Sequence, residues 1–326
     1  MKIGWTNMFV GLGGQRPGCR WRVLVIGLVL SLGAGCSMQR MAVNRLGDAL
    51  ASGGDTFASD DDPDLVQAAV PFSLKLMESL LAESPEHPGL LFATSSGFTQ
   101  YTYAFVQQDA DELENENLTR ATVLRARAKR LYLRARNYGL RGLETAHAGF
   151  RAKLVINPAE AVRHVTQADV ALLYWTAASW AAAISQAKDD PALIGELPQM
   201  EALMDRALAL DESFGQGAIH TFYIAYEMAR QDVKGDPALR ARQHFERAME
   251  LAQGLQAAPL VSFVESVCVQ KQDLKQFDQL LKQALSIDPD KQPRTRLANL
   301  VMQRRARWLL SRRDELFLIP EPPKAP

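Results

Sequence analysis

Cysteine is scarce in this chain, and neither sign of charge dominates. The 326 residues include 3 cysteines, an odd and sparse number that argues against a disulfide scaffold and against a zinc cluster built from thiolate pairs. Basic and acidic residues number 37 each, so the formal net charge is zero. A general nucleic-acid-binding protein needs a basic surface and is therefore not expected.

Motifs of catalysis and metal binding are missing as well. The sequence contains no GxSxG, no HExxH, no P-loop and no strand-linked GxGxxG. Cys268 lies between two valines in an apolar stretch, where a small buried hydrophobic residue is expected rather than an activated thiolate. The sequence therefore predicts no enzymatic activity, no cofactor and no metal site. The histidines include no pair at helical spacing: His87, His147, His164, His220 and His244.

The N-terminus has a short apolar run behind a basic flank. Residues 1–35 contain four basic residues and no acidic one, and the run 23–32 is shorter than the roughly 20 residues of a membrane-spanning helix. This pattern predicts a secretory signal. The small residues 33–35 before Cys36 resemble a bacterial lipobox, although Gly33 replaces the usual leucine. A plain secretory signal beside a coincidental cysteine is the alternative, and Met8 is a second candidate start.

Residues 1–35 are thus predicted to be a lipoprotein signal peptide, Cys36 the lipidation site, and residues 36–63 the lipidated N-terminus and linker. Several acyl chains would give stable membrane attachment. Ser37, rather than aspartate, resembles the outer-membrane sorting pattern, which predicts a periplasmic protein on the inner leaflet of that membrane. Cleavage would leave 33 basic and 37 acidic residues, a net charge of −4.

The mature chain has helical periodicity. From Asp64 onward apolar residues recur with a 3.6-residue period, and no stretch alternates as a half-buried strand does. An all-α domain is expected over residues 64–316, after a turn-rich loop at 51–63 and before an extended Pro-rich tail at 317–326. The predicted helices include residues 65–82, 90–108, 119–146 and 167–188.

The C-terminal half repeats itself. Helix-ending segments align at Ala207, Ala248 and Ala284, with spacings of 41 and 36 residues. Helices that end in Ala-Leu-x-Leu/Ile-Asp at this spacing are typical of tetratricopeptide-like pairs, in which alanine permits close packing. The expected fold class is therefore an all-α, tetratricopeptide-like helical repeat.

Two basic runs and a set of aromatic residues each allow two interpretations. The runs 120–141 and 294–313 either bind an acidic partner or lipid headgroups, or form solvated faces; acids at 109–116 would balance the first. The aromatic residues either line a pocket with their polar tips or form a plain core. Together with a neighbouring histidine, the candidate pore or ligand-lining residues are Tyr101, Tyr103, Tyr174, Trp175, Trp180, His220, Tyr223 and Tyr226.

Four segments carry a family resemblance: 131–140 (LYLRARNYGL), 173–180 (LYWTAASW), 203–211 (LMDRALALD) and 217–220 (GAIH). As a set they resemble the TatT family, the T components associated with TRAP (tripartite ATP-independent periplasmic) transporters. The resemblance spans about residues 41–310.

This resemblance implies a periplasmic lipoprotein that forms a homotrimer, with a pore through each protomer. It also implies association with the solute-binding P component and transport of hydrophobic or organic-acid ligands, without enzymatic activity. Residues in the matching segments, Tyr174, Trp175, Trp180 and His220, are the implied candidates for the pore wall. The alternative function is a tetratricopeptide-type envelope scaffold that binds another protein and has no small-molecule role.

Overall fold

The structure is a computed structural model that describes residues 44–50, 54–230 and 234–318. These residues form helices and connecting turns, with no strand among them, which confirms the predicted all-α class. The signal peptide, Cys36 and the tail from residue 319 lie outside the described residues and stay predictions.

Residues 44–50 are helical, and short 3-10 turns connect several of the later elements. The other helices of the described chain are α2 (Gly54–Ala58), α3 (Pro63–Glu83), α4 (Pro88–Thr102), the π-helix η1 (Tyr103–Gln107), α5 (Gln108–Glu112), α6 (Leu118–Ala146), α7 (Phe150–Ile156), α8 (Pro158–Ala161), α9 (Val170–Ser185), α10 (Pro191–Ile194), α11 (Leu197–Leu210), α12 (Ala218–Ala229), α13 (Pro237–Leu251), α14 (Ala258–Phe263), the π-helix η5 (Val264–Cys268), α15 (Val269–Lys271), α16 (Leu274–Ser286), α17 (Arg296–Ser311) and α18 (Arg313–Leu316).

Many helices begin at an Asp or Asn followed by proline. The Asp62 side chain accepts from the amides of residues 64 and 65 at the start of α3, and Asn157, Asp190 and Asp236 cap α8, α10 and α13 in the same way. The side-chain oxygen satisfies amides that lack an intrahelical acceptor, and proline at the first helical position loses no hydrogen bond. Such a motif marks the start of α3 at Pro63, close to the predicted start of that helix at residue 65.

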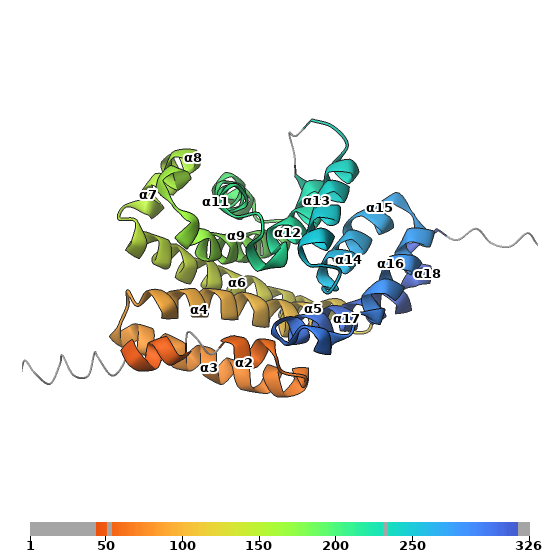
Figure 1. The fold of residues 1–326 in the computed structure, drawn as a ribbon, viewed down its shortest axis with the longest axis horizontal. Helices are drawn as coiled ribbons and strands as arrows, with labels where there is room; N and C mark the ends of the chain where they lie inside the picture. Colours follow the sequence, from red (N-terminus) through yellow and green to blue (C-terminus); the bar gives the residue numbers. More distant parts are fainter. Residues whose placement is uncertain (1–43, 51–53, 231–233, 319–326) are drawn as a thin grey trace, which may run out of the picture.

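The N-terminal helices form a layered stack. Helices α3, α4, α6, α9 and α11 pack in this order, as the layers in Figure 1 show. Gly139 makes one close approach possible, because a Cβ atom at that position would lie 2.1 Å from the Thr176 Oγ1 of α9. A side chain there would therefore push α6 away from α9.

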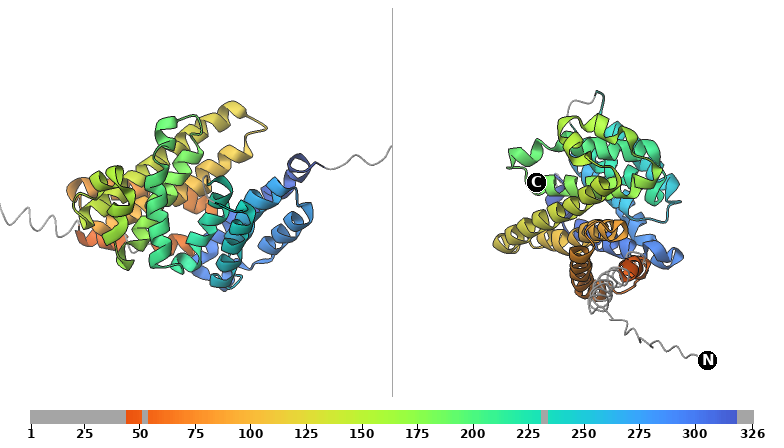
Figure 2. Two further views of the ribbon diagram at one scale, coloured as in Figure 1. Left: turned by 90° about the horizontal axis from the view of Figure 1, so that it is seen from above. Right: turned by 90° about the vertical axis from the view of Figure 1, so that its left-hand side faces the viewer.

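The C-terminal helices form a second group. Helices α12, α13, α14, α16 and α17 pack in succession, and Figure 2 shows this group beside the N-terminal stack. The alanines of the repeated motif, Ala207, Ala248 and Ala284, are each fully buried. Two hydrophobic cores result; Tyr103 packs against both, and α12 contributes residues to both.

The end of the chain returns to its beginning. Helix α17 contacts α2 and α3, and its arginines reach the acidic helix α5. Arg304 Nη2 lies 2.8 Å from Asp109 Oδ1 and 2.6 Å from Glu112 Oε2, and Arg305 Nη1 lies 3.0 Å from Asp111 Oδ2. Ion pairs across about 190 residues of sequence therefore join the two helical groups.

The prediction of a turn-rich loop over residues 51–63 is partly wrong. Residues 54–58 form α2, and the carbonyl of Ser59 accepts from Arg296 Nη1 at 2.9 Å. Contact with α17 explains the difference, because local sequence signals turns whereas tertiary packing stabilises a helix. At the other end, Phe317 is extended as predicted but packs edge-on against Phe277, with ring centroids 4.9 Å apart.

Helix α3 is long and apolar enough, by length and composition, to cross a membrane. It packs against α4, however, and buries Val66, Leu74, Met77, Leu80 and Leu81 in the protein core. Its composition is therefore explained by its place in the folded domain.

Candidate functional site

Three of the predicted residues lie together on α12, facing α11 and α13. The Tyr226 hydroxyl donates to Glu201 Oε1 at 2.7 Å, and the Tyr223 hydroxyl donates to Asp205 Oδ1. The rings of Tyr226 and Phe222 stack with centroids 5.3 Å apart. Burial raises the pKa of both tyrosines above the ordinary range, so their hydroxyls remain donors.

Arginine side chains neutralise the acidic residues around these tyrosines. Arg230 lies 3.2 Å from Glu201 and 3.0 Å from Asp205, and Arg240 lies 2.5 Å from the buried carboxylate of Glu227. The tyrosine hydroxyls and the charges are therefore satisfied within the protein. Since Tyr223 is 2% exposed, the partly exposed rings of Phe222 and Tyr226, rather than polar tips, are what this group offers to a ligand.

His220 pairs with a histidine that sequence reasoning did not select. The Nδ1 atoms of His220 and His244 lie 2.8 Å apart, and His220 Nε2 lies 3.2 Å from Glu212 Oε2. The Tyr223 ring stacks on His244 at 4.9 Å. Burial lowers the pKa of His244 to about 4 and also lowers that of His220. Both rings are neutral at neutral pH, so one donates to the other and ties α12 to α13.

Tyr174 and Trp175 form a second aromatic group, on α9. The Tyr174 ring lies 5.0 Å from that of Trp175 and 5.2 Å from that of Phe214, all three rings being partly exposed. Burial raises the pKa of Tyr174 to about 12. This group offers accessible aromatic surface within the helical body.

Trp180 is instead a structural tie. Its Nε1 donates to Glu196 Oε2 at 2.8 Å, and the same oxygen lies 2.6 Å from Arg136 Nη1. The Arg136 guanidinium lies over the indole ring, 4.9 Å from its centroid. Since Trp180 is 4% exposed, its role is to join α6, α9 and the turn before α11.

The remaining two candidates belong to the region around η1. Tyr101 is buried beside Phe105, with ring centroids 5.7 Å apart. The Tyr103 hydroxyl lies 3.5 Å from Met302 Sδ of α17, and burial raises its pKa above the ordinary range. Tyr103 therefore lies at the junction of the two helical groups, whereas Tyr101 belongs to the N-terminal core.

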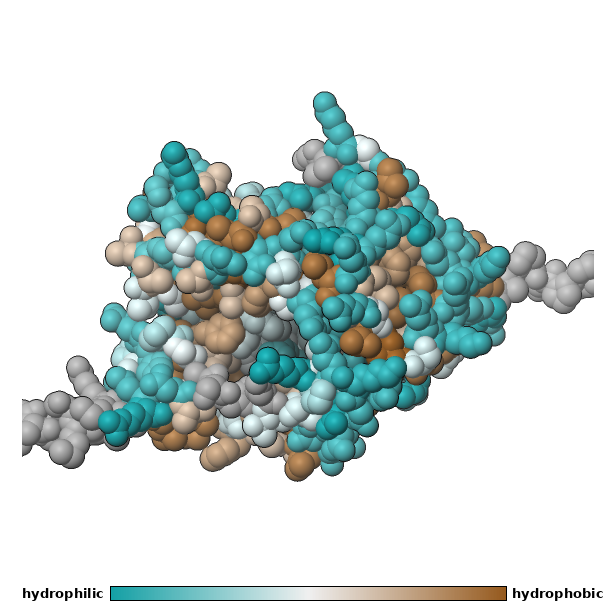
Figure 3. All heavy atoms as spheres, in the orientation of Figure 1, coloured by the Kyte–Doolittle hydropathy of each residue, from teal (hydrophilic) through white to brown (hydrophobic). Residues whose placement is uncertain are grey.

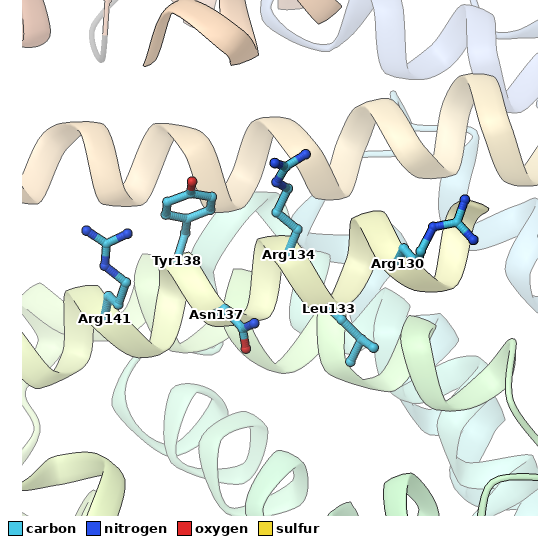
Figure 4. Close-up of a pocket in the computed structure, with 6 residues that line it drawn as sticks. All are labelled: Arg130, Leu133, Arg134, Asn137, Tyr138 and Arg141. Carbon is cyan, nitrogen blue, oxygen red and sulfur yellow. The ribbon is translucent and has the colours of Figure 1, made fainter. Parts of the chain in front are cut away.

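A cationic groove lies on the outer surface of α6 (Figure 4). It has a volume of about 390 Å³ and is lined by Arg130, Leu133, Arg134, Asn137, Tyr138 and Arg141. Figure 4 shows Arg134, Tyr138 and Arg141 on the side of α6 toward α4, with Leu133 and Asn137 on the other side.

Aromatic rings hold two arginines of this groove. The Tyr138 ring stacks parallel to Phe98 of α4, and the guanidinium of Arg141 lies 5.3 Å from the Tyr138 centroid. Arg134 lies 5.3 Å from the Phe98 centroid and pairs with Glu78 of α3 at 2.7 Å. The groove is therefore preorganised by packing against two neighbouring helices.

Comparison with known proteins agrees with the sequence resemblance. A sequence profile described as TRAP transporter T-component matches residues 59–317. The chain belongs to this family. It is also 30% identical over 303 residues to an uncharacterized protein of Treponema pallidum (strain Nichols), a match that covers 87% of this chain and 94% of that protein. The family associates this T-component with a TRAP transport system and with the cell envelope.

The structure divides the predicted ligand-lining residues of the T-component among separate places. His220, Tyr223 and Tyr226 lie together on α12, and Tyr174 and Trp175 form a second group on α9. The remaining candidates are Trp180, which contacts Glu196 and Arg136, and the tyrosines near η1, Tyr101 and Tyr103. The sequence did not single out the α11 carboxylates of Glu201 and Asp205. Their spacing of four residues on one helix, opposite tyrosines three apart on another, is the signal that pairs them.

A second cavity of the T-component, about 230 Å³, lies between α13 and the helix containing η5, and Cys268 is among its lining residues. Cys268 is 1% exposed, and burial raises the pKa of its thiol to about 12, so it is the buried hydrophobic residue that the sequence predicts. Across residues 44–50, 54–230 and 234–318, no cluster of three or more His, Cys, Asp or Glu residues could hold a metal ion.

Proposed function

We propose that this T-component is a lipid-anchored periplasmic adaptor that binds the solute-binding P component of a TRAP transporter and passes a hydrophobic or organic-acid ligand through an aromatic interior. The family match across the helical body is the observation that carries the proposal. The partly exposed rings of Tyr174, Phe214, Phe222 and Tyr226 support it, because they offer apolar surface on α9, on α12 and in the turn before α12. Figure 3 shows small apolar patches among the hydrophilic residues on one face of the protein.

Within this proposal, a hydrophobic ligand suits the α12 group better than a carboxylate does. The hydroxyls of Tyr223 and Tyr226 already donate to carboxylates, and Arg230 is occupied by Glu201 and Asp205. A carboxylate ligand would have to displace one of these partners, whereas an apolar ligand would contact ring faces at no such cost.

The proposed architecture consists of tetratricopeptide-like helix pairs. Helices α12 with α13, and α14 with α16, pack as neighbours, and the fully buried alanines of the repeated motif support close approach. The family resemblance adds trimer formation, with one pore in each protomer. Size-exclusion chromatography with light scattering measures the subunit number directly.

Lipid anchoring at Cys36 is the part of the proposal that fixes its location. Cys36→Ser should leave an unprocessed or soluble protein, because the thiol that accepts the lipid is gone. Unchanged membrane fractionation of this variant would contradict the anchor. Ser37→Ala is the matched control and should fractionate like the parent protein.

Affinity capture tests the partner. The anchored protein should recover a TRAP solute-binding P component, and failure to recover one under conditions that preserve a known complex would contradict the proposal. Native mass spectrometry then separates a conduit from the alternative envelope scaffold. Co-purified organic molecules, lost in Phe222→Ala but kept in a Phe72→Ala control on the exposed face of α3, support a conduit; an empty parent protein favours the scaffold.

A further inference from the structure

Helix α6 carries a repeating arrangement of arginines that the proposed function does not use. Arg120, Arg127, Arg134 and Arg141 follow one another at seven-residue intervals, and Arg130 lies three residues after Arg127. Seven residues are close to two helical turns, so these side chains lie on one slowly winding face about 30 Å long. A seven-residue repeat is the spacing by which one helix pairs with another.

Most of this face is available to a partner. Arg120, Arg127 and Arg130 are exposed, and within the described residues their side chains form no hydrogen bond or ion pair. Arg134 has one carboxylate partner, Glu78, which is shared with Lys75 at 2.7 Å. The face therefore keeps a positive charge that the described part of the protein does not neutralise.

The groove of α6 forms the C-terminal half of this face and shows what kind of surface fits it. Its lining comes from a single helix, so it is shallow and elongated and could not enclose a small molecule as a ligand pocket does. Apolar groups lie between the charges: the Tyr138 ring in the groove, and Val123, 53% exposed, seven residues before Arg130, while Leu133 borders the groove on its other side. An amphipathic helix in a groove makes contacts of this kind.

Charge and spacing favour an acidic helix over a lipid surface. Carboxylates at seven-residue intervals on a partner helix would meet the arginines one by one, and guanidinium groups bind carboxylates in a planar, two-pronged geometry. A fluid bilayer has no such spacing, and the net charge of −4 predicted for the mature chain opposes broad attraction to anionic lipid.

We infer that the face of α6 defined by Arg120, Arg127, Arg130, Arg134 and Arg141 is a docking surface for an acidic amphipathic helix of a partner protein, with Glu or Asp at seven-residue spacing. This surface is separate from the aromatic groups of α9 and α12. The inference does not depend on ligand passage or on the identity of the P component.

The test uses the full mature protein and a synthetic stapled helical peptide with glutamates at seven-residue spacing. A second peptide has the same composition with its glutamates at five-residue spacing. Titration by fluorescence anisotropy should show tighter binding of the peptide with seven-residue glutamate spacing than of the peptide with five-residue spacing. This difference in affinity should decrease as salt is added. Arg127→Ala/Arg130→Ala should weaken this binding about fivefold to tenfold, because two exposed ion pairs are lost.

A matched control removes two exposed cations elsewhere. Lys275 and Lys282 lie seven residues apart on α16, both exposed, and neither forms an ion pair with a described residue. Lys275→Ala/Lys282→Ala changes the net charge equally and should leave peptide affinity within about twofold of the parent. Urea unfolding of both double variants verifies that each is folded.

Four results would overturn the inference. The first three are no binding of the peptide with seven-residue glutamate spacing, equal affinity for the two peptides, and an equal loss of affinity in the α16 control. The fourth is that Arg127→Ala/Arg130→Ala abolishes binding to phosphatidylglycerol vesicles while it leaves peptide binding unchanged. The last result would assign the face to a membrane surface instead.

Discussion

Helices α6 and α17 are both rich in arginine, yet their charges have different surroundings. On α17, Arg304 and Arg305 pair with acids of α5, and Arg305 also binds Glu265 Oε1 at 2.6 Å and lies over the Trp308 ring. On α6, Arg127 and Arg130 have no partner among the described residues. Arginine content alone therefore does not distinguish a structural helix from a binding helix; the positions of the carboxylates do.

The difference follows from chain topology. Residues 109–116, which the sequence offers as a balance for the first basic run, reach only Arg125 of that run, through Asp111 and Glu114. Their other ion-pair partners come from the second run, about 190 residues later. The second run thus closes the fold, and much of the first remains unneutralised.

Removing the central arginine of α17 should have the largest effect. Arg305 is 11% exposed at its side chain, and Arg305→Ala leaves Asp111 and Glu265 without their shared cation. We expect a loss of about 3 kcal/mol in the free energy of unfolding, measured by urea titration with circular dichroism. Arg307→Ala, an exposed control on the same helix, should change it by less than about 0.5 kcal/mol. Similar losses in the two variants would contradict the structural role of Arg305.

An exception on α6 sharpens the comparison. Arg136 is 16% exposed at its side chain, pairs with Glu196 and covers Trp180, so it resembles the arginines of α17 rather than its neighbours. Arg136→Ala should cost about 2 kcal/mol in urea unfolding, because Glu196 loses a partly buried partner and the indole its cover. A loss below about 0.5 kcal/mol would show that Arg136 stabilises the fold no more than the exposed arginines Arg127 and Arg130 do.

Acid should weaken a third kind of contact, between neutral histidines. The pKa of His244 is lowered to about 4 in the folded protein, whereas an unfolded histidine titrates near 6.5. The unfolded chain binds more protons in this window, so the stabilisation is present above about pH 6.5 and is lost as pH falls toward 4. After allowance for partial exposure, we expect this contribution to be about 1 kcal/mol.

The histidine prediction is checked by urea unfolding at several pH values. His244→Gln keeps a hydrogen-bonding side chain without the titration, so its stability should fall less steeply between pH 6.5 and 4. If the free energy of unfolding falls equally with pH in the parent and the variant, His244 does not contribute to the acid dependence of stability.

The smallest expected change in stability belongs to the free arginines of α6. Arg127→Ala/Arg130→Ala should alter the free energy of unfolding by less than about 0.5 kcal/mol, since neither side chain has a described partner. The free energy of unfolding is measured by urea titration, with Arg305→Ala measured in the same series for comparison. A loss as large as that of Arg305→Ala would remove the distinction between the two helices.

Local sequence signals predicted much of the helical fold but not the contact of α17 with α2, α3 and α5. Helical periodicity predicts one helix over residues 119–146, and α6 spans Leu118–Ala146 after the N-cap Asn117. The π-helices η1 and η5 carry no such signal, because an extra residue in a helical turn is set by its surroundings.

The candidate site was predicted as residue types rather than as an arrangement. Tyrosines with polar tips were expected inside the helical body, and Tyr223 and Tyr226 have such partners. Which tyrosines lie together depends on helix packing, and the pairing of His220 with His244 joins residues on different helices. A periodicity argument follows one helix at a time and could not pair them.

Arginine-specific labelling with phenylglyoxal, followed by peptide mass spectrometry, compares α6 and α17 in one sample of the unmodified protein. Free guanidinium groups should react first, so Arg120, Arg127 and Arg130 of α6, together with the exposed Arg307 of α17, should be modified early. Arg305 and Arg136 should be protected by their carboxylates and rings. Modification of Arg305 as fast as that of Arg130 would contradict the division between arginines that hold the fold and arginines that remain free for a partner.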